Sequence, residues 1–186
     1  MLEQRDYLLD SMMLAHFAAA KCAGDRSKEE ATKRIVEKLE AIRARGNCKI
    51  FISSVTVGES EYGLKVATKV DVAQQAEARR VVDAFLPSLV FGIDTTVARE
   101  YYAELRARLF NRFAPKDRRG LAKSNFVGEW TDPVTQKMLG IQENDVWIAA
   151  IAMAYNLTLV SSDKMNTIRQ VAGSDLSFED WGTVPR

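Results

Sequence analysis

The sequence predicts an α/β fold in which helices cover both faces of a mainly parallel sheet. Short, almost continuously apolar runs alternate along the chain with longer stretches of helical periodicity. The apolar runs lack the regular polar alternation of a strand with one wet face, so both of their faces should be buried, as in parallel sheets. The 186 residues are enough for a substantial core, and we expect a single domain over residues 1–186.

The first predicted elements are a strand and two helices. The run "YLLD" at residues 7–10 is apolar up to its final acid and predicts a buried strand, and residues 11–24 continue as a helix. Residues 27–46 have the periodicity of an amphipathic helix, and Ser27 and Glu30 are spaced as a capping box at its start.

Two further strands and three helical stretches follow. The β-branched and aromatic run "KIFISSVTV" at 49–57 predicts a second strand. Residues 58–67 begin a helix, residues 71–86 form another, and the apolar run at 89–93 predicts a third strand. Residues 94–110 are helical again, so strand and helix keep alternating.

The last third of the chain contains the longest irregular stretch. Proline, glycine and charged residues accumulate between 111 and 141, which predicts an insertion or long loop, and such loops in compact domains are usually functional or mobile. The apolar segment "ENDVWIAAIAMAY" then predicts a helix, and residues 157–162 a fourth strand. Residues 163–173 form a short helix, and "LSFEDW" at 176–181 closes the chain.

Composition excludes several classes of protein. A net charge of +1 does not indicate a globally basic nucleic-acid binder. Cys22 and Cys48 have no zinc-site spacing and are too few for a disulfide framework, so we expect reduced thiols and a cytoplasmic protein. No stretch has the length and apolarity of a membrane span.

Four acids should meet at one edge of the sheet. Asp10, Glu59 and Asp163 each follow a predicted strand closely, and Asp145 begins a helix that can reach the same edge. Ligands of such sheets bind beyond the carboxyl ends of the strands. Each acid has an ordinary explanation when it is taken alone: Asp145 could simply favour the helix dipole, as Asp94 could cap the helix that follows it.

Four converging acids predict a cation site. Like charges in a cleft repel, so such a cluster persists only when protons or cations neutralise it. Magnesium and manganese prefer hard oxygen ligands and keep several waters. A magnesium site lined by acids points to phosphate chemistry, in which a metal-activated water attacks and no protein nucleophile is needed.

These segments resemble the PIN-domain family of metal-dependent ribonucleases, and within it the VapC-like toxins of type II toxin–antitoxin pairs. "YLLDSMML" looks like the family's first strand with its acid, Asp10. "ISSVTVGESEYG" is similar to the segment of the second acid, where Glu59 fits better than its rival Glu61. "NDVWIAAIA" resembles the most specific motif, with Asp145, and "LTLVSSD" the last one, with Asp163.

The resemblance covers residues 7 to 181 and implies a PIN-like three-layer α/β/α sandwich with a central parallel sheet. It implies that Asp10, Glu59, Asp145 and Asp163 are catalytic and hold Mg²⁺ or Mn²⁺. It further implies cleavage of RNA by an endoribonuclease, a small antitoxin protein as partner, and a homodimer.

The sequence departs from the family pattern after the last acid. The family often has a second aspartate or asparagine two residues on, where this chain has Met165. Asn166 could replace this accessory ligand, and Ser161 fits the serine or threonine that commonly precedes the last acid. The stretch 111–141 is also longer than the usual connection in the toxins, which could mark a different PIN branch.

A basic stretch is a candidate RNA contact. Seven cationic residues, opposed only by Asp117, are Arg106, Arg108, Arg112, Lys116, Arg118, Arg119 and Lys123. Four aromatic residues nearby could stack on unpaired bases: Phe110, Phe113, Phe126 and Trp130. The equally weighted alternative is a solvated helix face and loop, with the aromatic residues in a small core.

Two other functions compete with a metal-dependent endoribonuclease. Met165 favours an inactive PIN-like module that binds RNA or protein. A phosphotransferase on a similar sheet, such as a receiver or phosphohydrolase, typically has a D-x-D pattern on its first strand, which "LLDSMML" lacks.

Overall fold

The computed structural model describes residues 6–21, 30–67, 72–85, 89–121, 123–163 and 165–182. The expected capping residue Ser27 and the thiol of Cys22 lie outside these residues. Among the residues described, Cys48 is a free cysteine. No helix in these ranges is long and apolar enough to cross a membrane.

The core of the fold is a five-stranded sheet in the order β3-β2-β1-β4-β5, and every neighbouring pair is parallel. The strands are β1 (Tyr7–Leu9), β2 (Ile50–Ser53), β3 (Val90–Phe91), β4 (Thr158–Ser161) and β5 (Ser177–Asp180). The parallel α/β architecture predicted from the sequence is therefore confirmed. The closing segment, for which the sequence suggested no strand, forms the edge strand β5.

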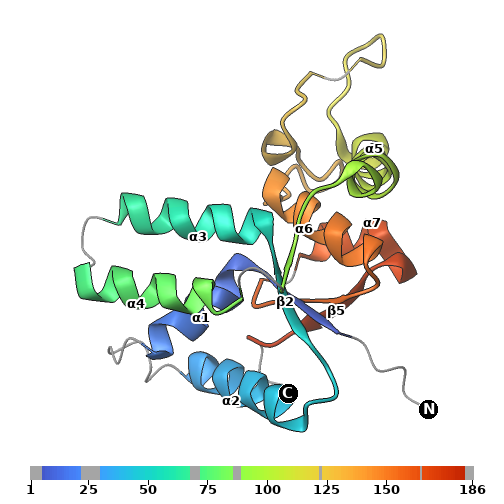
Figure 1. Cartoon of the computed structure of the whole chain (residues 1–186). Helices are drawn as coiled ribbons and strands as arrows, with labels where there is room; N and C mark the ends of the chain where they lie inside the picture. Colours follow the sequence, from blue (N-terminus) through green and yellow to red (C-terminus); the bar gives the residue numbers. More distant parts are fainter. Residues whose placement is uncertain are drawn as a thin grey trace.

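Helices cover both faces of this sheet (Figure 1). One face packs against α1 (Ser11–Lys21), α2 (Glu30–Arg45) and α4 (Val72–Asp83). The other packs against α5 (Ala103–Phe113), α6 (Glu143–Ala154) and α7 (Asn166–Ala172). The helix α3 (Ser54–Val66) leaves the end of β2 and contacts both α4 and α6. A π-helical segment, η2 (Val97–Tyr102), leads into α5.

Adjacent residues of the central strands point into different cores, as the pleat of a strand requires. Leu8 and its register partner Leu159 belong to the core beneath α5, α6 and α7. Leu9 and its partner Val160 belong to the core beneath α1, α2 and α4. All four side chains are buried, so the two central strands have no wet face, which explains their continuously apolar sequences.

The second strand is shorter than the sequence predicted. The prediction of a strand over 49–57 is wrong for its second half, because helix α3 begins at Ser54. The Ser53 hydroxyl accepts a 2.9 Å hydrogen bond from the Thr56 amide, a local N-cap that overrides the strand preference of the β-branched residues. Glu59 therefore stands in the second turn of a helix, not directly at a strand end.

The connection between α5 and α6 is irregular but well hydrogen bonded. Helix α5 extends to Phe113, so the connection, here named the 114–142 loop, begins slightly later than predicted. A 3-10 turn, η3 (Val127–Glu129), lies at its middle. Thr131 and Met138 form an antiparallel bridge, and the Lys123 amide donates to the Pro115 carbonyl oxygen at 2.8 Å.

Candidate functional site

Asp10 lies between β1 and α1, with only 5% of its surface exposed. One carboxylate oxygen accepts a 2.8 Å hydrogen bond from the Met13 amide, and the other accepts from the Ser161 hydroxyl. Burial, with smaller contributions from the charges of Asp145 and Glu59, raises the pKa of Asp10 to about 6, although the two hydrogen bonds lower it. Asp10 is therefore a buried acid that interacts electrostatically with two other acids of the predicted site, Asp145 and Glu59.

Asp145 stands in the first turn of α6. Its carboxylate accepts a 2.9 Å hydrogen bond from the Gln142 amide, in a capping box at the start of the helix. Burial raises its pKa to about 6 as well, with Glu59 and Asp163 adding to the rise. Asp145 therefore stands at the helix start, where the dipole explanation placed it, and forms a capping box there while it interacts electrostatically with the other acids.

Glu59 reaches the same place from α3. One of its oxygens accepts a 2.7 Å hydrogen bond from the Asn144 side chain, and the other accepts from the Ser11 hydroxyl. Its rival Glu61 instead pairs with Arg79, at 3.2 Å between Nε and Oε1. The structure therefore separates the two candidates, because the neighbours of Glu59 are the residues directly beside Asp145 and Asp10.

Asp163 and Ser161 complete the arrangement at the end of β4. The Ser161 side chain is fully buried, donates to Asp10, and accepts a 2.8 Å hydrogen bond from the Asp163 amide. The Asp163 side chain is exposed. The Ser161 hydroxyl therefore connects the carboxylate of Asp10 to the backbone of Asp163.

The position of Met165 is explained by packing. This residue is 9% exposed and belongs to the core beneath α5, α6 and α7, with a left-handed backbone at φ 42°. Its side chain is thus used in the core and supplies no oxygen. The next residue, Asn166, is exposed at the start of α7.

The four acids share one electrostatic neighbourhood, although within the described residues no three histidine, cysteine, aspartate or glutamate side chains are grouped so that they could hold a metal ion. Both oxygens of Asp10 and of Glu59 are occupied by protein donors. The donor chemistry fits magnesium or manganese, because all candidate ligands are carboxylates, whose hard oxygen atoms these ions prefer. Holding an ion would require these side chains to turn toward one another.

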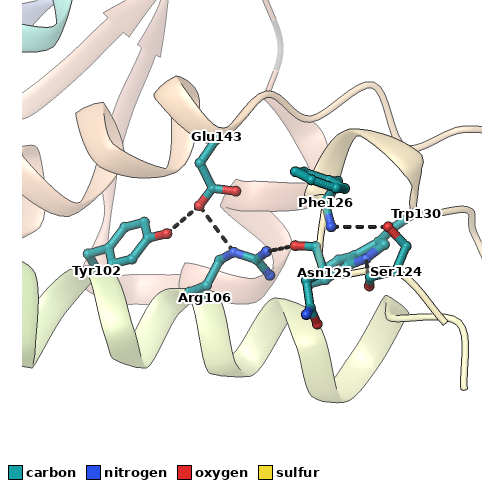
Figure 2. A network of polar contacts seen from close by, with 7 residues as sticks. All are labelled: Tyr102, Arg106, Ser124, Asn125, Phe126, Trp130 and Glu143. Carbon is teal, nitrogen blue, oxygen red and sulfur yellow. Dashed lines mark hydrogen bonds and ion pairs between the residues drawn. The ribbon is translucent and has the colours of Figure 1, made fainter. Parts of the chain in front are cut away.

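The sequence interpretation missed Ser11 and Asn144, which hold Glu59. The sequence did contain one indication of their role, because each residue is adjacent to a predicted acid. It also missed Glu143, which accepts hydrogen bonds from the Tyr102 hydroxyl and from Arg106 Nε, the latter at 3.1 Å (Figure 2).

Three of the seven basic residues form ion pairs, and one of these pairs, between the exposed Arg119 and Asp117, is long at 4.0 Å. Arg106 pairs with Glu143, and its guanidinium lies 4.4 Å from the centre of the Trp130 ring. Arg108 pairs with Glu104 and Asp175, both at 2.8 Å. Five of the seven are exposed at the end of α5 and in the 114–142 loop: Arg112, Lys116, Arg118, Arg119 and Lys123.

The aromatic residues divide in a similar way. Trp130 and Phe113 are buried, and Phe110 is partly buried with its ring edge-on to Trp130 at 5.9 Å. For these three, the alternative of a small core is what the structure shows. Phe126 differs, since 72% of its surface is exposed.

Solved structures resemble this chain along most of its length. VapBC2 from Rickettsia felis, bound to a DNA fragment from its promoter, has 22% identity and a TM-score of 0.58 over 94% of this chain and 98% of that one. DNA-bound VapBC from Salmonella typhimurium has 18% identity and a TM-score of 0.58 over 96% and 99%. VapBC-5 from Mycobacterium tuberculosis, a toxin–antitoxin system, has 16% identity and a TM-score of 0.51 over 95% and 97%.

These likenesses establish the fold, a PIN-like three-layer α/β/α sandwich. A comparison with curated proteins found no match. The model of the PIN domain family matches residues 7–173, which include Asp10, Glu59, Asp145 and Asp163. The match spans most of the 186 residues, and the chain therefore belongs to the PIN domain family.

Proposed function

We propose that this protein is a magnesium- or manganese-dependent endoribonuclease and the toxin of a toxin–antitoxin pair. The observation that carries the proposal is the mutual electrostatic influence of acids from β1, α3, α6 and the end of β4, with the pKa of both Asp10 and Asp145 raised to about 6. Perturbed acids that converge from distant parts of a chain are typical of catalytic sites.

The residues of the site have distinct tasks in this proposal. Asp10, Glu59, Asp145 and Asp163 would hold the metal, which when bound polarises the phosphodiester and lowers the pKa of an attacking water. Ser161 fixes the orientation of Asp10. Ser11 and Asn144 do the same for Glu59, and Asn166 is an accessory oxygen donor close to Asp163 in sequence.

The exposed basic residues at the end of α5 and in the 114–142 loop would bind the RNA backbone. Phosphate contacts by lysine and arginine give affinity that falls as salt rises. Five basic side chains are exposed and could contact phosphates: Arg112, Lys116, Arg118, Arg119 and Lys123. Arg106 and Arg108 would contribute only by giving up their ion pairs.

The partners in this proposal are a small antitoxin protein and a second copy of the chain, and the site of action is the cytoplasm. Support comes from the solved VapBC structures that share the fold, one of which is described as a toxin–antitoxin system. Co-expression with the protein encoded by the adjacent reading frame tests this part. A toxin predicts a stable complex and suppressed RNA cleavage, whereas unchanged cleavage would contradict it.

A second candidate is an inert PIN-like module that binds RNA or protein. The observation that favours it is that, among the described residues, no three acids are grouped to hold a metal. The occupation of the accessory position by the core residue Met165 points the same way. Titration with manganese separates the two, because an inert module has no need to bind the ion.

The proposed activity is tested by RNA cleavage in magnesium or manganese. Asp10→Asn and Asp145→Asn should each lower the cleavage rate at least about 100-fold, since even outer-shell partners of a metal site are worth 10- to 100-fold. Circular dichroism should show an unchanged fold. Glu61→Gln, which alters only the neighbouring rival paired with Arg79, should cleave normally. Wild-type cleavage by either aspartate variant would show that these acids are not the metal ligands.

A further inference from the structure

Phe126 is a large apolar side chain that the fold leaves in solvent. The three other aromatic residues of the basic region contribute to a core, whereas the Phe126 ring is 72% exposed. A single exposed apolar residue is ordinary and needs no explanation. Phe126 is informative because hydrogen bonds hold the backbone that carries its exposed ring.

The backbone around Phe126 is fixed from several directions. The buried Trp130 donates from Nε1 to the Ser124 carbonyl oxygen at 3.0 Å. The Ser124 hydroxyl accepts from the Phe126 amide at 3.1 Å and donates to Glu129. Arg106 donates to the Asn125 carbonyl oxygen. Figure 2 shows the hydrogen bond from the Phe126 amide to Ser124 and the one from Arg106 to the neighbouring Asn125, and no dashed line reaches the Phe126 ring.

The same network connects this ring to the acids. Arg106 bridges the Asn125 carbonyl to Glu143, which is the first residue of α6. The next residue, Asn144, donates to Glu59 at 2.7 Å, and Asp145 follows it. One guanidinium group therefore spans from the turn that carries Phe126 to the first turn of the helix that carries the acid.

The neighbouring charge favours a nucleic acid as the ligand of this surface. Four exposed cations precede Phe126 in the same loop: Lys116, Arg118, Arg119 and Lys123. A partner protein that uses Phe126 as an apolar anchor does not require these cations. Single-stranded nucleic acids are recognised by this combination of backbone-tracking cations and an aromatic ring on which a base stacks.

We propose that Phe126 is a stacking platform for one unpaired base of the RNA substrate, held at a fixed distance from the acids by the Arg106–Glu143 bridge. The proposal rests on the proposed function, whose substrate it narrows to single-stranded RNA. A rigid platform loses little conformational freedom on binding, so the stacking contact contributes fully to affinity. Duplex RNA offers no exposed base face and should not use it.

Binding without cleavage tests the proposal. The full chain, in EDTA, is titrated with short single-stranded oligoribonucleotides carrying 2-aminopurine, whose fluorescence is quenched by stacking. Phe126→Ala should weaken binding about 10-fold and remove part of the quenching, because stacking on one aromatic ring is worth about 1–3 kcal/mol. Phe126→Trp should restore both signals. Val134→Ala, at an apolar site in the same loop that is 87% exposed, is the matched control and should bind as wild type.

Three outcomes overturn the proposal. They are a wild type that does not quench the probe, a Phe126→Ala variant that binds RNA as tightly as wild type, and a Phe126→Ala variant that loses only an associated protein. Failure of the nuclease proposal is recognised separately. If RNA binding depends on Phe126 but no metal supports cleavage, the stacking proposal is supported and the nuclease proposal is contradicted.

Discussion

The acid site (Asp10, Glu59, Asp145 and Asp163) and the 114–142 loop, which meet at the start of α6, are built in different ways. The acids are placed by backbone topology, because β1, β4 and the starts of α3 and α6 meet at one edge of a buried parallel sheet. The loop has almost no regular structure and is placed by individual side chains, above all Arg106 and Trp130. The first region is fixed by regular secondary structure, and the second by side-chain contacts and by hydrogen bonds within the loop.

This difference has a thermodynamic consequence. The acid site contains buried charge that opposes folding, and the surrounding sheet tolerates it. The loop is held by the buried indole of Trp130 and by the guanidinium of Arg106 on α5, together with its own backbone hydrogen bonds. Substitutions of the acids should therefore change RNA cleavage while the fold survives. Substitutions of Trp130 or Arg106, which anchor the loop, should mainly lower the free energy of unfolding.

The largest expected effect is at the loop anchor. Trp130→Ala should lower the free energy of unfolding by about 3–5 kcal/mol, because it empties a fully buried site and removes the hydrogen bond to Ser124. Urea denaturation measures this change in the free energy of unfolding. The exposed neighbour Phe126, changed to alanine, should cost less than about 0.5 kcal/mol. Equal losses for the two variants would mean that Trp130 does not anchor the loop.

The next effect is at the acids and has the opposite sign. The pKa of Asp10 is raised to about 6 by burial, so the folded state prefers the protonated form and stability falls as pH rises from about 4 to about 6. Asp10→Asn removes this cost and should stabilise the metal-free protein by about 2–3 kcal/mol at pH 7.5, and hardly at pH 4.

Urea denaturation at the two pH values measures this difference, with Asp83→Asn, at an exposed position, as the control. The charges that face Asp10 from neighbouring elements are Asp145 and Glu59, and both act in the same direction. A variant less stable than wild type at pH 7.5 would show that Asp10 is stabilising as an ion.

Ser161→Ala tests whether the orientation of Asp10 matters separately from the presence of the metal-binding carboxylates. The variant keeps every acid but leaves Asp10 without its hydroxyl donor, so RNA cleavage in manganese should fall about 10- to 100-fold. More manganese should be needed to reach half-maximal rate. Ser174→Ala, at an exposed serine in the turn after α7, is the control. An unchanged rate would mean that Asp10 needs no positioning by Ser161.

The smallest effect is at the bridge between the two regions. Arg106→Ala should cost about 1 kcal/mol, since a partly exposed ion pair and a cation–π contact are both weak. Hydrogen exchange should speed up at Phe126 and Trp130 and stay slow at Leu8 and Leu9. Arg108→Ala, which breaks ion pairs to Glu104 and Asp175, should leave the loop amides protected. Slow exchange in the loop of the Arg106 variant would contradict the bridge.

The sequence was most informative where structure depends on periodicity and topology. The apolar runs around Leu8 and Leu159 predicted a parallel sheet, and the acids that follow them were predicted to share its edge. It was less informative where a local bond competes with propensity. Ser53 caps a helix inside a run that looks like a strand, which moved Glu59 from a strand end to a helix turn.

The loop shows the limit of prediction most clearly. Composition alone could not separate Phe126 from Trp130, because both are aromatic residues in an irregular, basic stretch. Their roles follow from contacts between residues far apart in sequence, such as Arg106 with Asn125 and Glu143. Ser11 and Asn144 were missed for a related reason, since a single sequence does not show which neighbours of an acid point toward another acid.

Manganese binding by isothermal titration calorimetry tests the central claim most directly, without any assumption about the RNA. If acids from the beginning, middle and end of the chain form one metal site, wild type binds manganese at pH 7.5, and Asp10→Asn and Asp145→Asn each weaken binding at least about 10-fold. Glu61→Gln, whose side chain pairs with Arg79 instead, should bind normally. Binding that is absent in wild type, or unchanged in either aspartate variant, would contradict the account.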